Sequence, residues 1–350
     1  MPVIEVGPTR THKTISAGVT AAKAGDTVQV DAGEYVDDIP SDVIRFSLHF
    51  IANGCRVVCK MTKPVPNQKG MFIAGPNDSS QPQISFDGFE MTGATNRDKN
   101  GAAVRYQSGN LTITNCFFHH NEDGVLATPF VLETGTVTIE NSEFAFNGAG
   151  DGQSHNIYVN KLERFEIRDS YFHDARVGHE IKSRSLNTTI TNTRIFDNQA
   201  TASYNVDVPN GGNVTIEHCA IQQGPNSQNP NMITYGVEGL NNPGRSVKVA
   251  NNIIVNDKPN GKLFYNSTQV PIDFVANDVW GLTENNLVYG GGPLNESGTT
   301  YLTTRPELDT SPIVPGEPPV EPPDIEEPPV EKPPVEGSAG SSGGSAPPAP

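Results

Sequence analysis

The chain has 350 residues, 40 Asp and Glu against 24 Lys and Arg, and a formal net charge of −16. Residues 315–350 hold seven acidic residues and one lysine, which places −6 on that segment and −10 on the rest. Sequence-independent binding to nucleic acid needs a basic surface, so we expect no nucleic-acid partner. No apolar run is long enough to span a bilayer, so we expect no membrane insertion.

Residues 1–60 are predicted to form an N-terminal cap and the first coils of a stack. Residues 12–24 have a short helical period, and residues 25–30 predict a strand that follows a turn. An amphipathic helix at this point would cover the open end of a stack. Residues 1–14 are polar and contain no apolar segment of the kind found in secretory signals.

A phrase of the form apolar–x–Asn–x–x–large apolar recurs at intervals of 23 to 33 residues between about residues 84 and 280. Its three marked positions are held first by Ile84, Ile113, Ile139, Ile167, Ile190, Ile216, Val249 and Val275, then by Phe86, Asn115, Asn141, Asp169, Asn192, His218, Asn251 and Asn277, and last by Phe89, Phe118, Phe144, Phe172, Ile195, Ile221, Ile254 and Trp280. One unit has too few apolar residues to close a core, so units must stack. The repeat predicts an all-β parallel β-solenoid of nine or ten coils, with the Asn side chains bonded from coil to coil.

A second ladder lies between these phrases. It consists of the triplets 103–105, 124–126, 156–158, 180–182, 205–207 and 236–238, each centred on Val or Ile. A constant β-branched centre with variable neighbours is typical of a strand that has one face in a core and the other in solvent. We therefore expect the outward positions to carry the chemistry.

The composition changes near residue 312. Residues 315–334 repeat Pro-Pro-Val-Glu and variants, and residues 337–350 are rich in Gly, Ser and Ala. Such sequence cannot bury apolar surface, which predicts a disordered Pro-rich tail. The domain prediction is thus a cap at 1–60, a β-helix body at 61–311 and a linker or tail at 312–350. The tail is either a surface tether or a link to a C-terminal domain absent from this chain.

The densest set of polar residues lies on the middle coils. With Ile157, Ile181 and Val206 pointing inward, the residues on either side are expected to point outward. They form two columns: Asn156, Glu180 and Asn205 in one, and Tyr158, Lys182, Asp207 and Glu238 in the other, with Arg184 on the same face as Lys182.

This set suits proton abstraction beside the carboxylate of a uronic acid, which needs a charge partner for the carboxylate, a base and a proton donor. We predict Lys182 as the base, Arg184 as the carboxylate partner, and Tyr158 or His179 as the donor. The predicted substrate-binding residues are Asn156, Glu180, Asn205, Asp207, Glu238 and His155. An alternative is structural: the charged residues form cross-strand ion pairs, and His155 and His179 stack as interior residues. His119, His120 and His173 are predicted to lie in surface turns.

Two stretches carry a resemblance to a known family. Thr14-Ile15, Ala21-Ala22, residues 25–28 and residues 33–35 resemble the start of pectate-lyase-like right-handed β-helix proteins. The runs 150–159, 170–174, 178–184 and 203–212 resemble bacterial right-handed β-helix repeat proteins, some of them similar to catalytic modules of secreted proteins with calcium-binding tails.

The resemblance implies a right-handed β-helix and an extracellular polysaccharide lyase or C5-epimerase that acts on an acidic glycan. Chondroitinase B and related alginate lyases have a Lys and an Arg in an arrangement similar to Lys182 and Arg184. The alternative function is a non-catalytic glycan-binding or adhesive module. The resemblance further implies a secreted or cell-surface protein without an N-terminal secretion signal, with a cytoplasmic protein as the alternative. No structural metal site and no obligatory cofactor are expected; Ca²⁺ is the candidate ion.

Overall fold

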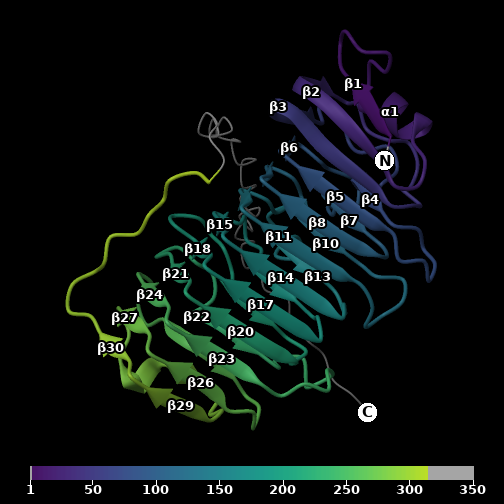
Figure 1. The fold of residues 1–350 in the computed structure, drawn as a ribbon. Helices are drawn as coiled ribbons and strands as arrows, with labels where there is room; N and C mark the ends of the chain where they lie inside the picture. Colours follow the sequence, from purple (N-terminus) through teal and green to yellow (C-terminus); the bar gives the residue numbers. More distant parts are fainter. Residues whose placement is uncertain (1, 314–350) are drawn as a thin grey trace, which may run out of the picture. The chain divides into compact units, whose positions relative to one another are not determined.

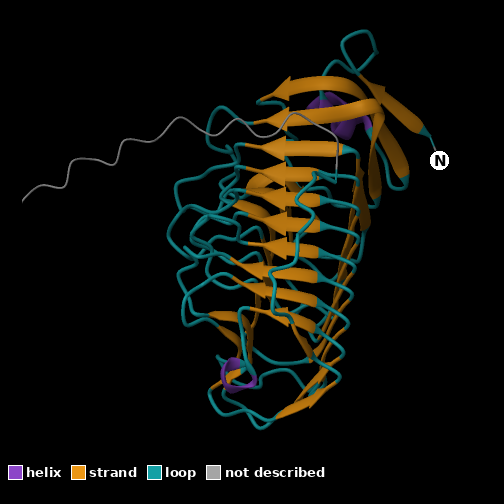
Figure 2. Ribbon diagram, turned by 90° about the vertical axis from the view of Figure 1, so that its left-hand side faces the viewer, coloured by secondary structure: helices purple, strands orange, loops and turns teal. Residues whose placement is uncertain are grey.

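The computed structural model describes residues 2–313, which form a parallel β-solenoid of about 12 turns (Figures 1 and 2). Each complete coil contributes two strands to a large bent sheet of 21 strands and one strand to a second sheet of nine strands. All pairings between neighbouring coils are parallel, from β1 paired with β2 to β27 paired with β30. The predicted stacking of coils is confirmed, and the stack is longer than the nine or ten coils expected.

The strands fall into three ladders. The first ladder of the large sheet comprises β1 (Val3–Val6), β2 (Asp26–Val36), β3 (Leu48–Lys60), β5 (Gln83–Asp87), β8 (Asn110–Thr114), β11 (Thr136–Glu140), β14 (Arg164–Arg168), β17 (Asn187–Thr191), β20 (Asn213–Glu217), β23 (Val247–Ala250), β26 (Ile272–Val275) and β29 (Leu294–Ser297). The second comprises β6 (Phe89–Thr92), β9 (Phe117–His119), β12 (Glu143–Ala145), β15 (Tyr171–His173), β18 (Arg194–Phe196), β21 (Ala220–Gln223), β24 (Ile253–Asn256), β27 (Asp278–Trp280) and β30 (Thr300–Tyr301). The nine-stranded sheet comprises β4 (Gly70–Ala74), β7 (Ala102–Tyr106), β10 (Asp123–Ala127), β13 (Ile157–Val159), β16 (Ile181–Ser183), β19 (Val206–Val208), β22 (Asn231–Tyr235), β25 (Lys262–Asn266) and β28 (Val288–Tyr289).

The predicted helix near the N-terminus is present as α1 (Ile15–Ala21), and a short 3₁₀ helix follows later at Glu284–Asn286. Thr14 caps α1 by accepting a hydrogen bond from the Ala17 N–H at 3.1 Å, and Asp38 accepts from the Ile15 and Ser16 amides. Ile15 and Gly18 are buried and pack the helix against the first coils (Figure 1). No helix in residues 2–313 is both long and apolar enough to cross a membrane.

The core consists of inward residues that lie in register from coil to coil. Ile113, Ile139, Ile167, Ile190 and Ile216 pair in sequence, as predicted. In the first and last repeat units the predicted register differs from the observed one by one or two residues, because an alternating strand offers more than one inward residue. At the start of the repeat Phe86 and Met91 align with Ile113 and Phe118, while Ile84 and Phe89 are buried core residues in other rows; at its end Phe274 and Val279 point inward instead of Val275 and Trp280.

The turn between the two ladders of the large sheet explains the recurrent Asn. Asn115, Asn141 and Asn192 have φ of 54°, 44° and 48°, a left-handed conformation that Asn tolerates better than most residues. The Asn141 amide donates to Asn115 Oδ1 at 2.6 Å, so the predicted side-chain ladder exists. Asn141 and Asn192 are exposed, however, so the ladder runs along the outside of the corner.

The last described segment runs back along the stack instead of ending at the final coil (Figure 1). Arg305 binds Asp257 at 2.9 Å, Asp309 binds Arg194 at 3.2 Å, and the Ile313 N–H donates to Glu143 Oε2 at 2.9 Å. We call residues 302–313 the return segment. The predicted disordered tail falls almost wholly on residues 314–350, which lie outside the described residues.

Candidate functional site

The predicted site lies on the outward face of the nine-stranded sheet, at β13, β16 and β19. Tyr158, Lys182 and Asp207 pair in register on these strands, and Ile157, Ile181 and Val206 point into the core, as expected. These three outward side chains are therefore neighbours along one column. Each is held by a strand that is hydrogen-bonded on both sides, which makes the geometry of the column rigid.

Lys182 lies at the centre of a polar cluster. Its Nζ is 2.8 Å from Asp207 Oδ2 and 3.5 Å from His179 Nε2, and its side chain is 14% exposed. Asp207 is buried and also accepts a hydrogen bond from Thr234 Oγ1. The sequence predicts Lys182 as a base flanked by Arg184, whereas the structure pairs its Nζ with the buried carboxylate of Asp207.

Arg184 links Tyr158 to Glu238. Its Nη1 donates to the Tyr158 hydroxyl, and its Nη2 donates to the two oxygens of Glu238 at 2.7 and 2.8 Å. The guanidinium carbon also lies 5.1 Å from the centre of the Tyr158 ring. Burial raises the pKa of Tyr158, and the Arg184 charge opposes that rise.

His155 and His179 stack on each other, with ring centroids 4.6 Å apart and planes at 12°, and Tyr204 stacks on the far side of His179. Nδ1 of His179 accepts from the Tyr204 amide, which leaves Nε2 to carry the proton and face Asp207 at 3.4 Å. Burial lowers the pKa of both histidines well below the usual range, and Lys182 lowers each further. His155 and His179 are thus stacked interior residues, as the structural alternative expects for these two side chains.

The column of Asn156, Glu180 and Asn205 does not face outward, so that part of the site prediction is wrong. All three residues are fully buried. They precede the first strand residues, where the chain is still turning a corner, so the alternation of the strand has not begun. Glu180 accepts from the Ala175 amide and from Asn156, and Asn205 donates to Asp197 and to the Gln222 carbonyl. These side chains fill the corner and cannot touch a glycan.

Glu238 reaches the site by a different route from the one predicted. The strand residue after Val206 in the ladder is Ile233, so Thr234 takes the outward position assigned to Glu238. Glu238 belongs to the loop after β22 and arrives at Arg184 from there. Because of this shift in register, the predicted ladder also omits two outward tyrosines on later coils, Tyr265 and Tyr289.

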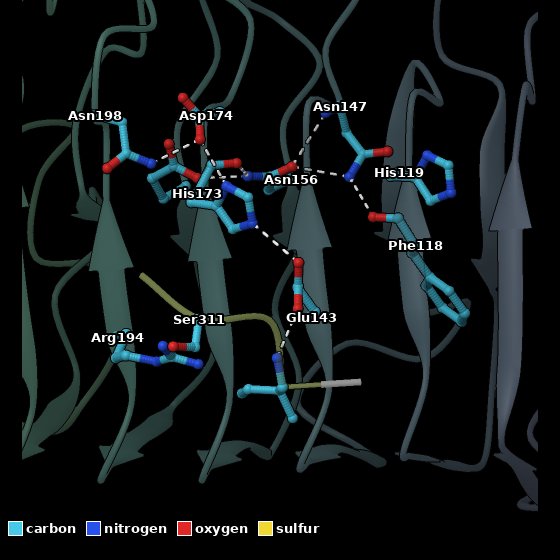
Figure 3. A network of polar contacts seen from close by, with 12 residues as sticks. Phe118, His119, Glu143, Asn147, Asn156, His173, Asp174, Arg194, Asn198 and Ser311 are labelled. Carbon is cyan, nitrogen blue, oxygen red and sulfur yellow. Dashed lines mark hydrogen bonds and ion pairs between the residues drawn. The ribbon is translucent and has the colours of Figure 1, made fainter. Parts of the chain in front are cut away.

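A second polar network lies on the second ladder of the large sheet (Figure 3). His173 Nδ1 is 2.6 Å from Asp174 Oδ2, and its Nε2 is 3.2 Å from Glu143 Oε1, the carboxylate that also binds Ile313. His119 occupies the equivalent position two coils earlier and lies 3.0 Å from Glu90. His119 and His173 are buried strand residues, so the prediction of surface turns is wrong for them. His120 lies in a turn, and burial lowers its pKa to about 4.

The described residues contain no group of three or more His, Cys, Asp or Glu side chains that could hold a metal ion. In the two networks the side chains of His119, His173, His179 and Lys182 each lie beside one or two carboxylates, whereas His155 accepts the His179 N–H. Lys182 and Arg184 of the first network can bind an anion. The Tyr158 hydroxyl can exchange a proton with a ligand.

The structure is similar to solved β-helix enzymes at low sequence identity. An alginate lyase from a Paenibacillus species is 14% identical, with a TM-score of 0.49, and the match covers 86% of this chain and 99% of that chain. The A-module of a mannuronan C-5 epimerase from Azotobacter vinelandii is 13% identical, with a TM-score of 0.47 and coverage of 83% and 95%. A pectate lyase is 14% identical, with a TM-score of 0.46 and coverage of 87% and 79%.

Identities this low assign no role to any residue of this chain. No curated protein sequence matches it. Residues 100–279, slightly more than half of the chain, match the family described as the right handed beta helix region. These residues span β7 to β27 and include every residue of the predicted site. The chain belongs to the right handed beta helix family.

Proposed function

We propose that the chain is a polysaccharide lyase or C5-epimerase that acts on a uronate-containing glycan at the outward face of β13, β16 and β19. The observation that carries this proposal is the pair of cations, Lys182 and Arg184, placed beside the Tyr158 phenol. The surrounding body carries a net charge of −10, and these two neighbouring cations provide a local positive charge that suits recognition of a carboxylate.

In this proposal the cations neutralise the uronate carboxylate, which lowers the cost of negative charge at C5 when its proton leaves. Tyr158 exchanges protons with the sugar, and Arg184 stabilises the phenolate form. In a lyase the Tyr158 phenolate takes the C5 proton, a C4=C5 double bond forms as the C4–O bond breaks, and Tyr158 returns the proton to the leaving oxygen. In an epimerase Tyr158 keeps the C5 proton and a solvent water protonates C5 from the other side.

Arg184 has both edges engaged in the described structure, one by Glu238 and the other by Tyr158. A uronate carboxylate would replace Glu238 on its edge. Glu238 is suited to such an exchange, because its side chain is 46% exposed and its loop has glycines at positive φ on either side, Gly236 at 66° and Gly239 at 103°. His179 keeps its proton toward Asp207 and orients the carboxylate that holds Lys182.

The second candidate is a glycan-binding module without turnover. The contacts in the described structure favour this candidate. Lys182 is paired with Asp207 and Arg184 with Glu238. Among residues 2–313, no unpaired carboxylate lies within this cluster to act as a base. The two candidates share the same face and the same ligand class. They differ only in whether a bond is broken or a C5 centre inverted.

The test is a panel of alginate, pectate, glucuronan and glycosaminoglycans. Unsaturated product is followed by absorbance, and proton exchange at C5 is followed by NMR. Lys182→Met and Arg184→Ala are each expected to lower kcat/KM by about 10²-fold or more, because each removes charge that faces the reacting centre. Lys248→Ala, which removes a cation on the large sheet paired with Glu217, is the matched control.

Lys182→Met leaves Asp207 buried and unpaired, so Lys182→Met with Asp207→Asn is measured alongside it to separate lost stability from lost activity. Full turnover in the Lys182 and Arg184 variants would contradict the proposal. Binding without any reaction, lost in the Lys182 variants, would identify the glycan-binding module instead.

A further inference from the structure

We propose that Tyr265 and Tyr289 form a sugar-stacking platform on the outward face of β25 and β28, and that a glycan held at Lys182 extends from there toward the C-terminal coils. This inference rests on the proposed function for the position of the first sugar. The inference adds the direction in which the glycan extends and the minimum length of glycan that reaches the platform. It also adds two residues that the sequence pattern did not place in the site.

The two tyrosines lie in the same outward column as the proposed site. The register runs through Lys182, Asp207, Thr234, Tyr265 and Tyr289. Neighbouring coils are separated by about 4.8 Å, so Tyr265 and Tyr289 lie roughly 14 and 19 Å from Lys182 along the stack. One 1→4-linked pyranose is about as long as one coil spacing. A glycan parallel to the stack therefore places its fourth sugar at Tyr265 and its fifth at Tyr289.

Exposed aromatic rings lie in one direction along the column. On the N-terminal side of Tyr158 it continues with Leu126, Arg105 and Ile73, and Leu126 and Ile73 are buried. On the C-terminal side Asp207 and Thr234 are also buried, and beyond them Tyr265 is half-buried and Tyr289 is 55% exposed. A glycan centred on Lys182 therefore reaches exposed aromatic surface only toward the C-terminal coils, past these two buried positions.

The chemistry of the two rings fits a sugar ligand. Their centroids are 5.2 Å apart and their planes are tilted by 54°, so together they present a shallow aromatic surface. Three other tyrosines donate to backbone carbonyls, Tyr35 to Asp31, Tyr106 to Gly109 and Tyr235 to Gly212. Among the hydrogen bonds of residues 2–313, none involves the hydroxyl of Tyr265 or Tyr289, so both phenols are available to a ligand. An aromatic ring with a polar tip can cover the apolar face of a pyranose and bond its hydroxyl groups.

Stacking needs only the pyranose face. The platform is therefore expected to bind neutral as well as acidic oligosaccharides, with the preference for acidic ones coming from Lys182 and Arg184.

Calorimetric titration of the full chain tests the platform. The probes are oligogalacturonates and cello-oligosaccharides of two to six sugars, and every protein carries Tyr158→Phe so that turnover does not disturb the measurement. Tyr265→Leu with Tyr289→Leu keeps apolar cover and removes both rings. We expect this double variant to bind oligogalacturonates of five sugars about tenfold more weakly and those of two or three sugars unchanged.

The matched control is Phe130→Leu. Phe130 is an aromatic side chain that is 58% exposed and follows β10, on the N-terminal side of the site, and its removal should change no affinity. The platform is wrong if the double variant binds oligomers of five sugars as the parent does, if Phe130→Leu weakens binding equally, or if the parent binds neither series.

Lys182→Met in the same background separates this inference from the proposed function. Loss of affinity in the tyrosine variant with none in the Lys182 variant would retain the platform and remove the uronate site. The reverse pattern would retain the uronate site and remove the platform. Loss in both variants, with the tyrosine effect confined to oligomers of four sugars or more, is the expected result.

Discussion

At the scale of single residues, the most consequential group outside the catalytic proposal is Glu180. Burial raises the pKa of its carboxyl well above the usual range, and the nearby Asp197 raises it further. Asn205 follows Glu180 in the same column, and its Oδ1 is buried without a hydrogen-bond donor in the described structure. A protonated Glu180 supplies a donor in that corner, whereas an ionised one would add an unpaired charge.

A raised folded-state pKa makes stability depend on pH in a definite direction. The contribution of Glu180 is fully present below its unfolded pKa of about 4.5 and is lost as pH rises toward the folded value. Glu180→Gln cannot ionise, so the free energy of unfolding should fall less steeply between pH 5 and pH 8 than in the parent. Urea denaturation at several pH values measures this. Parallel pH profiles for the two proteins would show that Glu180 is not protonated in the fold.

At the scale of elements, β15 and the return segment are joined through one histidine. Burial lowers the pKa of His173, but its contacts with Asp174 and Glu143 outweigh burial, and the net shift is upward. Because Glu143 also accepts the Ile313 N–H, the charge on His173 helps to hold the return segment on the stack (Figure 3).

The stability supplied by His173 is fully present below its unfolded pKa of about 6.5 and is lost as pH rises through the folded pKa. We therefore expect the protection factor of the Ile313 amide, corrected for the intrinsic exchange rate, to fall above this range. In His173→Asn the same protection should be lower and independent of pH. The amide of Ile167, inside β14, is the internal reference. An Ile313 protection factor that stays constant in the parent across this range would contradict the coupling.

At the scale of the whole molecule, the strand pairings of the stack form a one-dimensional array, because each strand pairs only with strands of the neighbouring coils. Ile15 is fully buried between α1 and the first coils. Ile15→Ala should cost about 2–4 kcal/mol locally. Hydrogen exchange is expected to speed up in β1, β2 and β3 and to stay unchanged in β16 and β19. Equal acceleration throughout would show that the stack unfolds as one cooperative unit.

The sequence was sufficient for the architecture and for part of the site. A period of 23 to 33 residues, an Asn at most of the turns and β-branched inward residues predicted the stacked coils and the neighbourhood of Tyr158, Lys182 and Asp207. The corners were not predictable in this way, because a strand pattern says nothing of where alternation begins. For that reason Asn156, Glu180 and Asn205 were placed outside, and the tyrosines of β25 and β28 were missed.

Some contacts between distant coils could not be predicted from a local sequence pattern either. The contact of Arg184 with Glu238 joins residues 54 positions apart, and that of Glu143 with Ile313 joins residues 170 apart. Both involve loops or a terminal segment that fold back on the stack. Such contacts depend on the length and path of the connection, which the repeat does not encode.

The unbroken register has a consequence for how this chain can change. The turn asparagines are 23 to 33 residues apart, yet Ile113, Ile139, Ile167, Ile190 and Ile216 stay aligned. All variation in coil length is therefore accommodated between strands, for example in residues 128–135 and 236–246. An insertion in those loops reshapes the rim of the nine-stranded sheet and leaves every strand in place, whereas one extra residue inside a strand would exchange its two faces.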